Sequence, residues 1–337
     1  MNSASACSKK IGSLLVAALA STSIAVHAQT PASAEVAKTC SFVNIANLAL
    51  KSDGMTVTAD GSVNQTKAVM LIASGAQNTL LTKVEASKLG LSAPASTGKG
   101  KKAALDTRSQ IDEFSIGSIE LGKMRILTMT KLGDYPEYGA LIGADFLFQH
   151  DLELTLATGT LRFFKPVGCE GSNLAYWDEN AAAVALSDLS PGDHRPVITV
   201  ELNGQKMRAL IDSAAPVSVL DLASAARLGV TPHSSGVTPM KKADQSGTSS
   251  SSWIAPFSEF SVGGEVIKNV KMPILDLKKI VNADNPAATP DMILGEDFLH
   301  AHRVLFALSQ HQFYFSYLSG KVFNMDAQAD AATAPKS

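Results

Sequence analysis

The chain has 337 residues, of which 45% are hydrophobic and 18% are charged, and its formal net charge is −2. This length suits about two domains of ordinary size, and the apolar content is sufficient for packed cores. Because the Lys and Arg residues form no strongly basic block, the composition argues against nucleic acid or an anionic membrane as a partner.

The N-terminal segment is typical of an export signal. Lys9 and Lys10 precede an apolar run over residues 11–26, and Ala28 supplies a small residue at the usual cleavage position. We therefore predict a signal peptide over residues 1–28 and a periplasmic or secreted mature protein. The run is too short and too rich in Ser and Ala for a convincing membrane span, so we expect no span after cleavage. The alternative is an uncleaved anchor.

Two cysteines, Cys40 and Cys169, remain after the predicted cleavage. An even pair in an exported chain is typical of one disulfide. The bridge would close a loop long enough to stabilise the fold by roughly 4–5 kcal/mol in the chain-entropy model. Two free buried thiols are the alternative.

The first half of the chain is predicted to be mainly β-structure. Asn64 and Gln65 occupy a hairpin turn, and a short helix over residues 86–89 is ended by Gly90. A tight turn follows at residues 157–160, before a strand over residues 161–164.

The second half repeats this order. Residues 197–202 are rich in β-branched side chains and predict a strand, Asn203 and Gly204 predict a hairpin turn, and residues 206–211 predict the return strand. A short helix over residues 223–228 is ended by Gly229. We therefore expect a mainly-β fold with a few short helices.

The chain is an internal duplication. Three apolar blocks recur in the same order, at residues 71–76 and 210–215, 114–117 and 260–263, and 141–147 and 293–299. The offset grows from 139 to 146 to 152 residues, so the second copy contains two small insertions. The Ser-rich run at residues 249–252 is predicted to be a flexible loop in one of them.

A duplication of this size indicates two similar lobes rather than a solenoid, whose periods are much shorter. We place lobe one at residues 40–169, a linker at residues 170–194 and lobe two at residues 195–324. The tail over residues 325–337 has too little apolar content to fold and is predicted to be disordered.

Each lobe contains the same pair of motifs. In lobe two, Asp212 and Ser213 follow a strand, and Gly295 lies in a later Ile-Leu-Gly-x-Asp-Phe-Leu block; Gly143 lies in the matching block of lobe one. This order resembles the bacterial retropepsin-like aspartic proteases. The resemblance implies two closed β-barrel lobes related by a pseudo-two-fold axis, with a peptide-binding cleft between them.

The resemblance also implies that each lobe supplies one Asp to a carboxylate pair that shares a proton. Lobe one departs from this pattern, because Ala73 stands where the Asp is expected, although Ser74 and Gly75 are kept. Lobe two keeps Asp212 but has Ala214 at the position of the motif glycine. The residue pattern therefore predicts a degenerate site that holds one carboxylate.

Loss of one general acid–base partner typically lowers a rate by about 10²–10⁴. We therefore expect an exported aspartic-protease homologue that binds peptides or a partner protein and is catalytically impaired or inactive. One alternative is an active endopeptidase that works through Asp212, either as a slow monomer or as a homodimer that pairs Asp212 from two chains. Another is a structural envelope protein.

Several other polar residues have structural explanations. Asp145 and Asp297 are predicted to cap short helices. His300, His302 and His311 lie close together in the sequence, but their spacing does not favour a metal site.

The remaining candidates carry weak signals. Ser74 and Ser213 have no His or Asp partner at a recognisable motif position, and the Gly/Lys run at residues 98–102 lacks the spacing of a phosphate-binding loop. Trp253 lies in the expected flap region, where it either touches a bound peptide or packs under a hairpin. We expect neither a metal nor a cofactor.

Overall fold

The structure is a computed structural model, and it describes residues 40–91, 108–128, 137–240, 252–280 and 288–323. These residues all belong to one compact unit, Lys38–Ser337. Four predicted segments lie outside the described residues: the signal peptide, the Gly/Lys run, most of the Ser-rich run and the C-terminal tail.

Lobe one is built on one sheet. Its strands are β2 (Lys51–Ser52), β3 (Val57–Val63), β4 (Thr66–Ile72), β5 (Leu80–Leu81), β6 (Arg108–Ile111), β7 (Phe114–Ile116), β8 (Ile119–Leu121), β9 (Met124–Thr128) and β10 (Ala140–Ile142). They run in the order β6-β9-β5-β10-β4-β3-β7-β8, and β2 pairs with β3. Two short helices accompany them, α1 (Lys83–Lys88) and α2 (Ala144–Leu147).

Lobe two repeats this plan. Its strands are β14 (Ser187–Ser190), β15 (Asp193–Leu202), β16 (Gln205–Ile211), β17 (Val219–Asp221), β18 (Thr238–Pro239), β19 (Trp253–Val262), β20 (Glu265–Leu275) and β21 (Met292–Leu294). Their order is β14-β15-β16-β21-β17-β20-β19-β18. The helices are α3 (Leu222–Arg227), α4 (Leu277–Ile280) and α5 (Glu296–Leu299).

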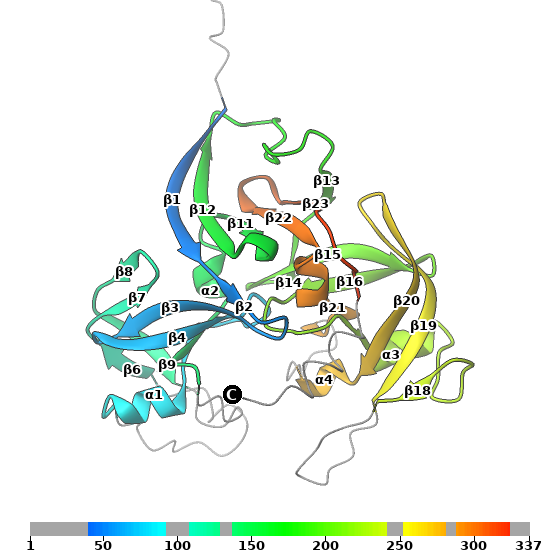
Figure 1. Cartoon of the computed structure of the whole chain (residues 1–337), viewed down its shortest axis with the longest axis horizontal. Coiled ribbons are helices and arrows are strands. Elements are labelled where there is room, and N and C mark those ends of the chain that lie inside the picture. The colour runs from blue at the N-terminus through cyan, green and yellow to red at the C-terminus, as the bar shows by residue number, and fades with distance from the viewer. Residues whose placement is uncertain (1–39, 92–107, 129–136, 241–251, 281–287, 324–337) are drawn as a thin grey trace, which may run out of the picture. The chain divides into compact units, whose positions relative to one another are not determined.

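A third sheet joins the two lobes (Figure 1). It contains β1 (Ser41–Ala49), β12 (Thr160–Val167), β11 (Asp151–Thr155), β22 (His302–Ala307), β23 (Gln312–Tyr317) and β13 (Ala182–Ala185), in that order. The antiparallel pairing of β11 with β22 crosses from one lobe to the other. The main hydrophobic core likewise draws its buried residues from both lobes.

The mainly-β architecture and the two lobes are confirmed, but the two barrels are not equally closed. Lobe two closes through the pairing of β15 with β19. Lobe one has the equivalent pairing, of β3 with β7, but there the strand is interrupted between β6 and β7, at Asp112 and Glu113. The two expected β lobes are therefore present, as a closed barrel in lobe two and a half-barrel in lobe one among the described residues.

The two hairpin turns confirm the duplication at the level of single hydrogen bonds. Asn64 and Asn203 both adopt positive φ angles, of 46° and 49°, which Asn tolerates better than most residues. The Asn64 Oδ1 accepts hydrogen bonds from the N–H groups of residues 112 and 113. The Asn203 Oδ1 accepts them from the N–H groups of residues 258 and 259. Each turn residue thus holds the strand beside it.

The two predicted helices form with caps at both ends. Thr82 caps α1 through its side-chain oxygen, and Asp221 caps α3 in the same way. Gly90 and Gly229 follow these helices with φ angles of +61° and +73°, the left-handed conformation that commonly ends a helix.

The segment predicted to be a linker is more ordered than expected. It contains β13 and β14, which pair with β23 and β15. Residues 170–194 therefore contribute strands to the joining sheet and to the sheet of lobe two.

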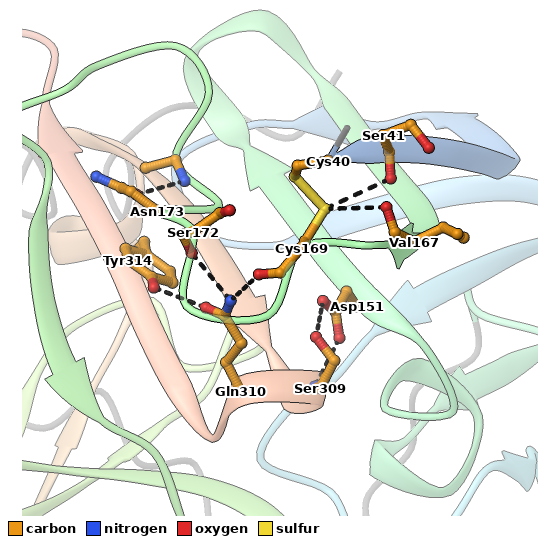
Figure 2. Close-up of a disulfide and its surroundings, with 11 residues drawn as sticks. Cys40, Ser41, Asp151, Val167, Cys169, Ser172, Asn173, Ser309, Gln310 and Tyr314 are labelled. Carbon is orange, nitrogen blue, oxygen red and sulfur yellow. Dashed lines mark hydrogen bonds between the residues drawn. A yellow bond between two sulfur atoms is a disulfide. The ribbon is translucent and has the colours of Figure 1, made fainter. Parts of the chain in front are cut away.

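The disulfide between Cys40 and Cys169 is confirmed (Figure 2). It links the start of β1 to the residues after β12, which already pair through Ser41 and Val167. Gln310 of lobe two also contacts the bridged segment, because its Nε2 donates a hydrogen bond to the carbonyl oxygen of Cys169 at 3.2 Å. Within the described residues, no helix is both long and apolar enough to cross a membrane.

Candidate functional site

Two loops meet where the lobes join, and each begins at the end of a strand. Residue 73 follows β4 and residue 212 follows β16. The Ala73 N–H donates to the carbonyl oxygen of Ile142, and the Asp212 N–H donates to that of Leu294, both at 2.9 Å. The parallel pairings β4–β10 and β16–β21 therefore fix the base of each loop.

Ser74 and Ser213 form a reciprocal serine clamp between these loops. The Ser74 hydroxyl donates to the Ile211 carbonyl at 2.9 Å, and the Ser213 hydroxyl donates to the Ile72 carbonyl at 2.7 Å. Each hydroxyl also accepts from the backbone N–H of the other serine, at 2.9 and 3.1 Å. Both serines are buried, so the clamp satisfies polar groups that water cannot reach.

Asp212 lies next to this clamp and is held by backbone groups from both lobes. Its Oδ1 accepts from the Gly75 N–H at 3.1 Å and from the Ala214 N–H at 2.9 Å. No described residue donates a hydrogen bond to Oδ2. The side chain is partly buried, and Oδ2 is the oxygen left for a ligand or for water.

Burial raises the pKa of Asp212 above its usual range. The Ala214 and Gly75 N–H groups and the positive charge of Arg195 act in the opposite direction, because each favours the ionised carboxylate.

Gly75 approaches Asp212 too closely to carry a side chain. A Cβ built on Gly75 would lie 2.3 Å from the Asp212 Cγ and 2.5 Å from its Oδ2. Ala214 is the lobe-two equivalent of Gly75, and Ala73 is the lobe-one equivalent of Asp212. Because Ala73 is buried and ends in a methyl group, lobe one supplies no carboxylate at this position.

Arg195 is a site residue that the sequence did not reveal. Its Nη1 donates to the Gly75 carbonyl at 3.3 Å, and its Nε and Nη2 bind the carboxylate of Asp193 at 2.9 and 2.7 Å. Both side chains of the pair are only about one-tenth exposed. The available signal was the Asp-x-Arg spacing, which places both residues on one face of a strand.

Gly143 and Gly295 lie beneath the loops, as the resemblance implies. A Cβ on Gly143 would lie 2.5 Å from the Asn78 backbone, and one on Gly295 would lie 2.5 Å from the Ala215 carbonyl oxygen. Because these glycines have no Cβ, the backbone at Gly143 can approach the loop after Ala73, and the backbone at Gly295 can approach the loop after Asp212.

The prediction that Asp145 and Asp297 cap short helices is wrong. The N-caps of α2 and α5 are Gly143 and Gly295, with no side-chain hydrogen bond. Asp297 accepts from the Ser218 N–H at 2.8 Å and from its hydroxyl at 2.7 Å. Asp145 accepts in the same way from Thr79 of lobe one. Asp145 therefore bonds α2 to the segment after the Ala73 loop, and Asp297 bonds α5 to the segment after the Asp212 loop.

The histidines do not gather into one cluster with other ligands. His302 is buried, with Nδ1 beside the Phe298 carbonyl oxygen and Nε2 beside the Glu265 carboxylate. Among the described residues, no group of three or more His, Cys, Asp or Glu side chains is arranged to hold a metal ion. Trp253 begins β19, where it pairs with Ile274 and packs partly buried against the core.

Models of known protein families match a segment of each lobe. A model of the aspartyl protease family matches residues 198–298, and a model of the putative aspartyl proteases of gag polyproteins matches residues 59–149. The chain belongs to the aspartyl protease family. One family domain lies in each lobe, and the matched ranges include residues 73 and 212.

Two solved structures show a similar arrangement at low sequence identity. The aspartic proteinase from Irpex lacteus is 12% identical, with a TM-score of 0.47; the match covers 83% of this chain and 98% of that one. Basic 7S globulin from soybean is 10% identical, with a TM-score of 0.45 and coverage of 82% and 96%. A search of curated proteins found no match.

Proposed function

We propose that this aspartyl protease homologue binds an extended peptide, or a segment of a partner protein, at the loops that carry Asp212, and that its hydrolytic activity is severely impaired. One observation carries the proposal: the serine clamp is complete, but it holds a site with one carboxylate. In a two-carboxylate site, one group ionises while the other donates a proton. A methyl group at residue 73 performs neither role.

Asp212 keeps the capacity to bind polar groups of a peptide. Its Oδ2 has no donor among the described residues, and burial raises the pKa of the carboxyl. A protonated Oδ2 would donate to a peptide carbonyl, whereas an ionised Oδ2 would accept from a peptide N–H. The site therefore supports recognition of a peptide backbone through one carboxyl group.

The same raised pKa favours a second candidate, a slow peptidase in which Asp212 alone activates water. Its homodimeric form requires Asp212 from another chain to approach this one. Gly75 of the same chain already lies at hydrogen-bond distance from Asp212, and the joining sheet pairs the lobes within one chain. These contacts support a site made within one chain.

We also propose that the protein is exported to the periplasm or secreted. The disulfide supports this location, because such bonds persist in oxidising compartments. Detection of a mature N-terminus near residue 29 in a periplasmic or culture-medium fraction tests it; an unprocessed cytoplasmic protein would overturn it.

The function is tested by incubating the protein with a diverse peptide library at acidic and neutral pH. Mass spectrometry would then score peptides that are retained intact and peptides that are cut. We expect retention that weakens in Asp212→Asn, with little or no cleavage. Efficient cleavage that disappears in Asp212→Asn would establish the peptidase instead. A folded protein that neither retains nor cuts any peptide would favour a purely structural role.

A further inference from the structure

A cavity of about 480 Å³ lies on the six-stranded sheet that joins the lobes, away from the Asp212 loops. Residues of β1, β11, β12 and β22 contribute to its lining. Its polar lining is formed by one carboxylate, two guanidinium groups, three hydroxyl groups and one amide: Glu153, Arg162, Arg303, Thr155, Thr158, Thr160 and Asn47. Its volume falls within the range of roughly 300–1,000 Å³ that is typical of small-molecule sites.

The charges that line this cavity do not balance. Glu153 is only 2% exposed, and its Oε1 accepts from Arg162 Nη2 at 2.9 Å and from Arg303 Nε at 3.1 Å. The Tyr176 hydroxyl donates to its Oε2 at 2.6 Å. The single carboxylate is therefore fully bonded, as a buried charge requires, while two guanidinium groups share it. One positive charge of this cluster has no partner within it.

Several guanidinium N–H groups remain available to a ligand. The side chain of Arg162 is 41% exposed, and that of Arg303 is 21% exposed. No described residue accepts a hydrogen bond from Nε or Nη1 of Arg162, or from Nη1 of Arg303. A guanidinium group presents its donors as a planar fork that matches the two oxygens of a carboxylate.

The position of Arg303 is fixed before any ligand binds. Its guanidinium lies 4.4 Å from the ring centroid of Trp177 and 5.1 Å from that of Tyr176. Both aromatic residues follow Cys169, whose disulfide and hydrogen bond to Gln310 anchor the segment (Figure 2). Trp177 is held further by its Nε1, which donates to the Ser316 hydroxyl at 3.2 Å. Such preorganisation lowers the cost of ordering the site on binding.

We propose that this cavity binds a carboxylate, carried either by a small organic acid or by the C-terminus of a peptide. Arg162 and Arg303 would hold the anion. Leu48, Leu161 and Leu318 also line the cavity and would contact the apolar chain attached to it. The site does not depend on the proposed function of the Asp212 loops.

Calorimetric titration of the disulfide-bonded protein with two pairs of probes tests the proposal. Hexanoate is compared with hexanol, and a trileucine peptide with a free C-terminus is compared with its amide. We expect saturable binding of at least one acid and binding at least tenfold weaker for its neutral analogue. Binding of hexanoate alone would assign a small organic acid, and binding of the free-acid peptide alone would assign a peptide C-terminus. Failure of both acids to saturate would overturn the proposal, as would equally tight binding of inorganic phosphate.

Two variants separate this site from general surface charge. Arg162→Gln should weaken binding of the acid by roughly tenfold or more, because it removes charged hydrogen bonds to the anion. The fold should persist, since Arg303 and Tyr176 still bond to Glu153; thermal unfolding checks this. Lys165→Gln removes an exposed charge from the same strand and should leave the affinity unchanged. Unchanged affinity in a folded Arg162→Gln protein would contradict the assignment.

Discussion

Gly75 of lobe one lies against the carboxylate of Asp212 in lobe two, so closely that a Cβ on Gly75 would lie 2.3 Å from the Asp212 Cγ. The Gly75 N–H also donates to this carboxylate. The glycine of this loop is thus kept in lobe one, where it lies against a carboxylate, whereas the equivalent residue of lobe two is Ala214 and the residue equivalent to Asp212 is Ala73. We infer that the two alanines are sterically coupled, because a carboxylate at residue 73 would leave as little room at residue 214 as Asp212 leaves at Gly75.

This coupling predicts that the stability of the fold depends strongly on the residue type at position 75 and weakly on that at position 214. Gly75→Ala should destabilise the fold by about 1–3 kcal/mol, because the new methyl group overlaps Asp212 and forces the loops apart. Ala214→Gly, its matched control, should change the free energy of unfolding by less than about 1 kcal/mol, the usual backbone cost of a glycine. Chemical denaturation of both variants measures the difference. Equal costs would contradict the coupling.

The serine clamp should behave as one unit. Ser74→Ala and Ser213→Ala each remove a hydroxyl that donates to a carbonyl of the other lobe and accepts a buried N–H. Leaving such groups unsatisfied should cost about 1–3 kcal/mol in each single variant. The double variant should cost less than the sum of the two, because both changes disrupt the same set of bonds. A double-mutant cycle by chemical denaturation checks this, and strict additivity would contradict it.

Arg195 and Asp193 should tolerate joint replacement better than separate replacement. Arg195→Gln alone leaves the Asp193 carboxylate buried without its ion-pair partner, and breaking such a pair typically costs about 3–5 kcal/mol. The double variant Asp193→Asn/Arg195→Gln removes both charges and should recover much of this loss. Thermal and chemical unfolding of the three variants measures the recovery. A double variant less stable than Arg195→Gln would show that the pair acts in another way.

Asp297 should make the protein less stable as the pH rises. Burial raises the pKa of Asp297 to about 6 from its usual value of 3.8. A raised pKa in the folded state means that the stabilising contribution is fully present below the unfolded value and is lost as the pH rises through the folded value. The wild-type protein should therefore lose stability relative to Asp297→Asn between about pH 4 and pH 7.

The measurement for Asp297 is the free energy of unfolding of both proteins across this range, together with an NMR titration of the carboxyl group. Asp297→Asn stays neutral and can still accept from Ser218, so its curve isolates the ionisation of this one group. Parallel curves for the two proteins would show that Asp297 does not titrate in this range.

The sequence predicts features that depend on local pattern and on repetition. The hairpin turns at Asn64 and Asn203, the capped helices and the equivalence of residues 73 and 212 all follow from short motifs that occur twice. The joining sheet could not be predicted in the same way, because the pairing of β11 with β22 unites strands that are about 150 residues apart. No local pattern specifies such a partner.

The errors have similar physical causes. Asp145 and Asp297 look like helix caps because they stand beside a helix start, but their carboxylates bond to Thr79 and Ser218, which are far away in the sequence. Arg195 could not be predicted as a site residue, because it contacts the site through a hydrogen bond to the Gly75 carbonyl of the other lobe. In each case the decisive partner is brought close only by the tertiary fold.

The serine clamp joins two loops that together carry one carboxylate, Asp212, with Ala73 at the equivalent position. The most direct test is the peptidase activity of Ala73→Asp/Ala214→Gly, compared with the wild-type protein and with each single variant. We predict a gain of peptide cleavage in the double variant, little gain in Ala73→Asp alone because the Ala214 methyl group opposes the new carboxylate, and loss of the gain when Asp212→Asn is added. A folded double variant with no more activity than the wild-type protein would contradict this account.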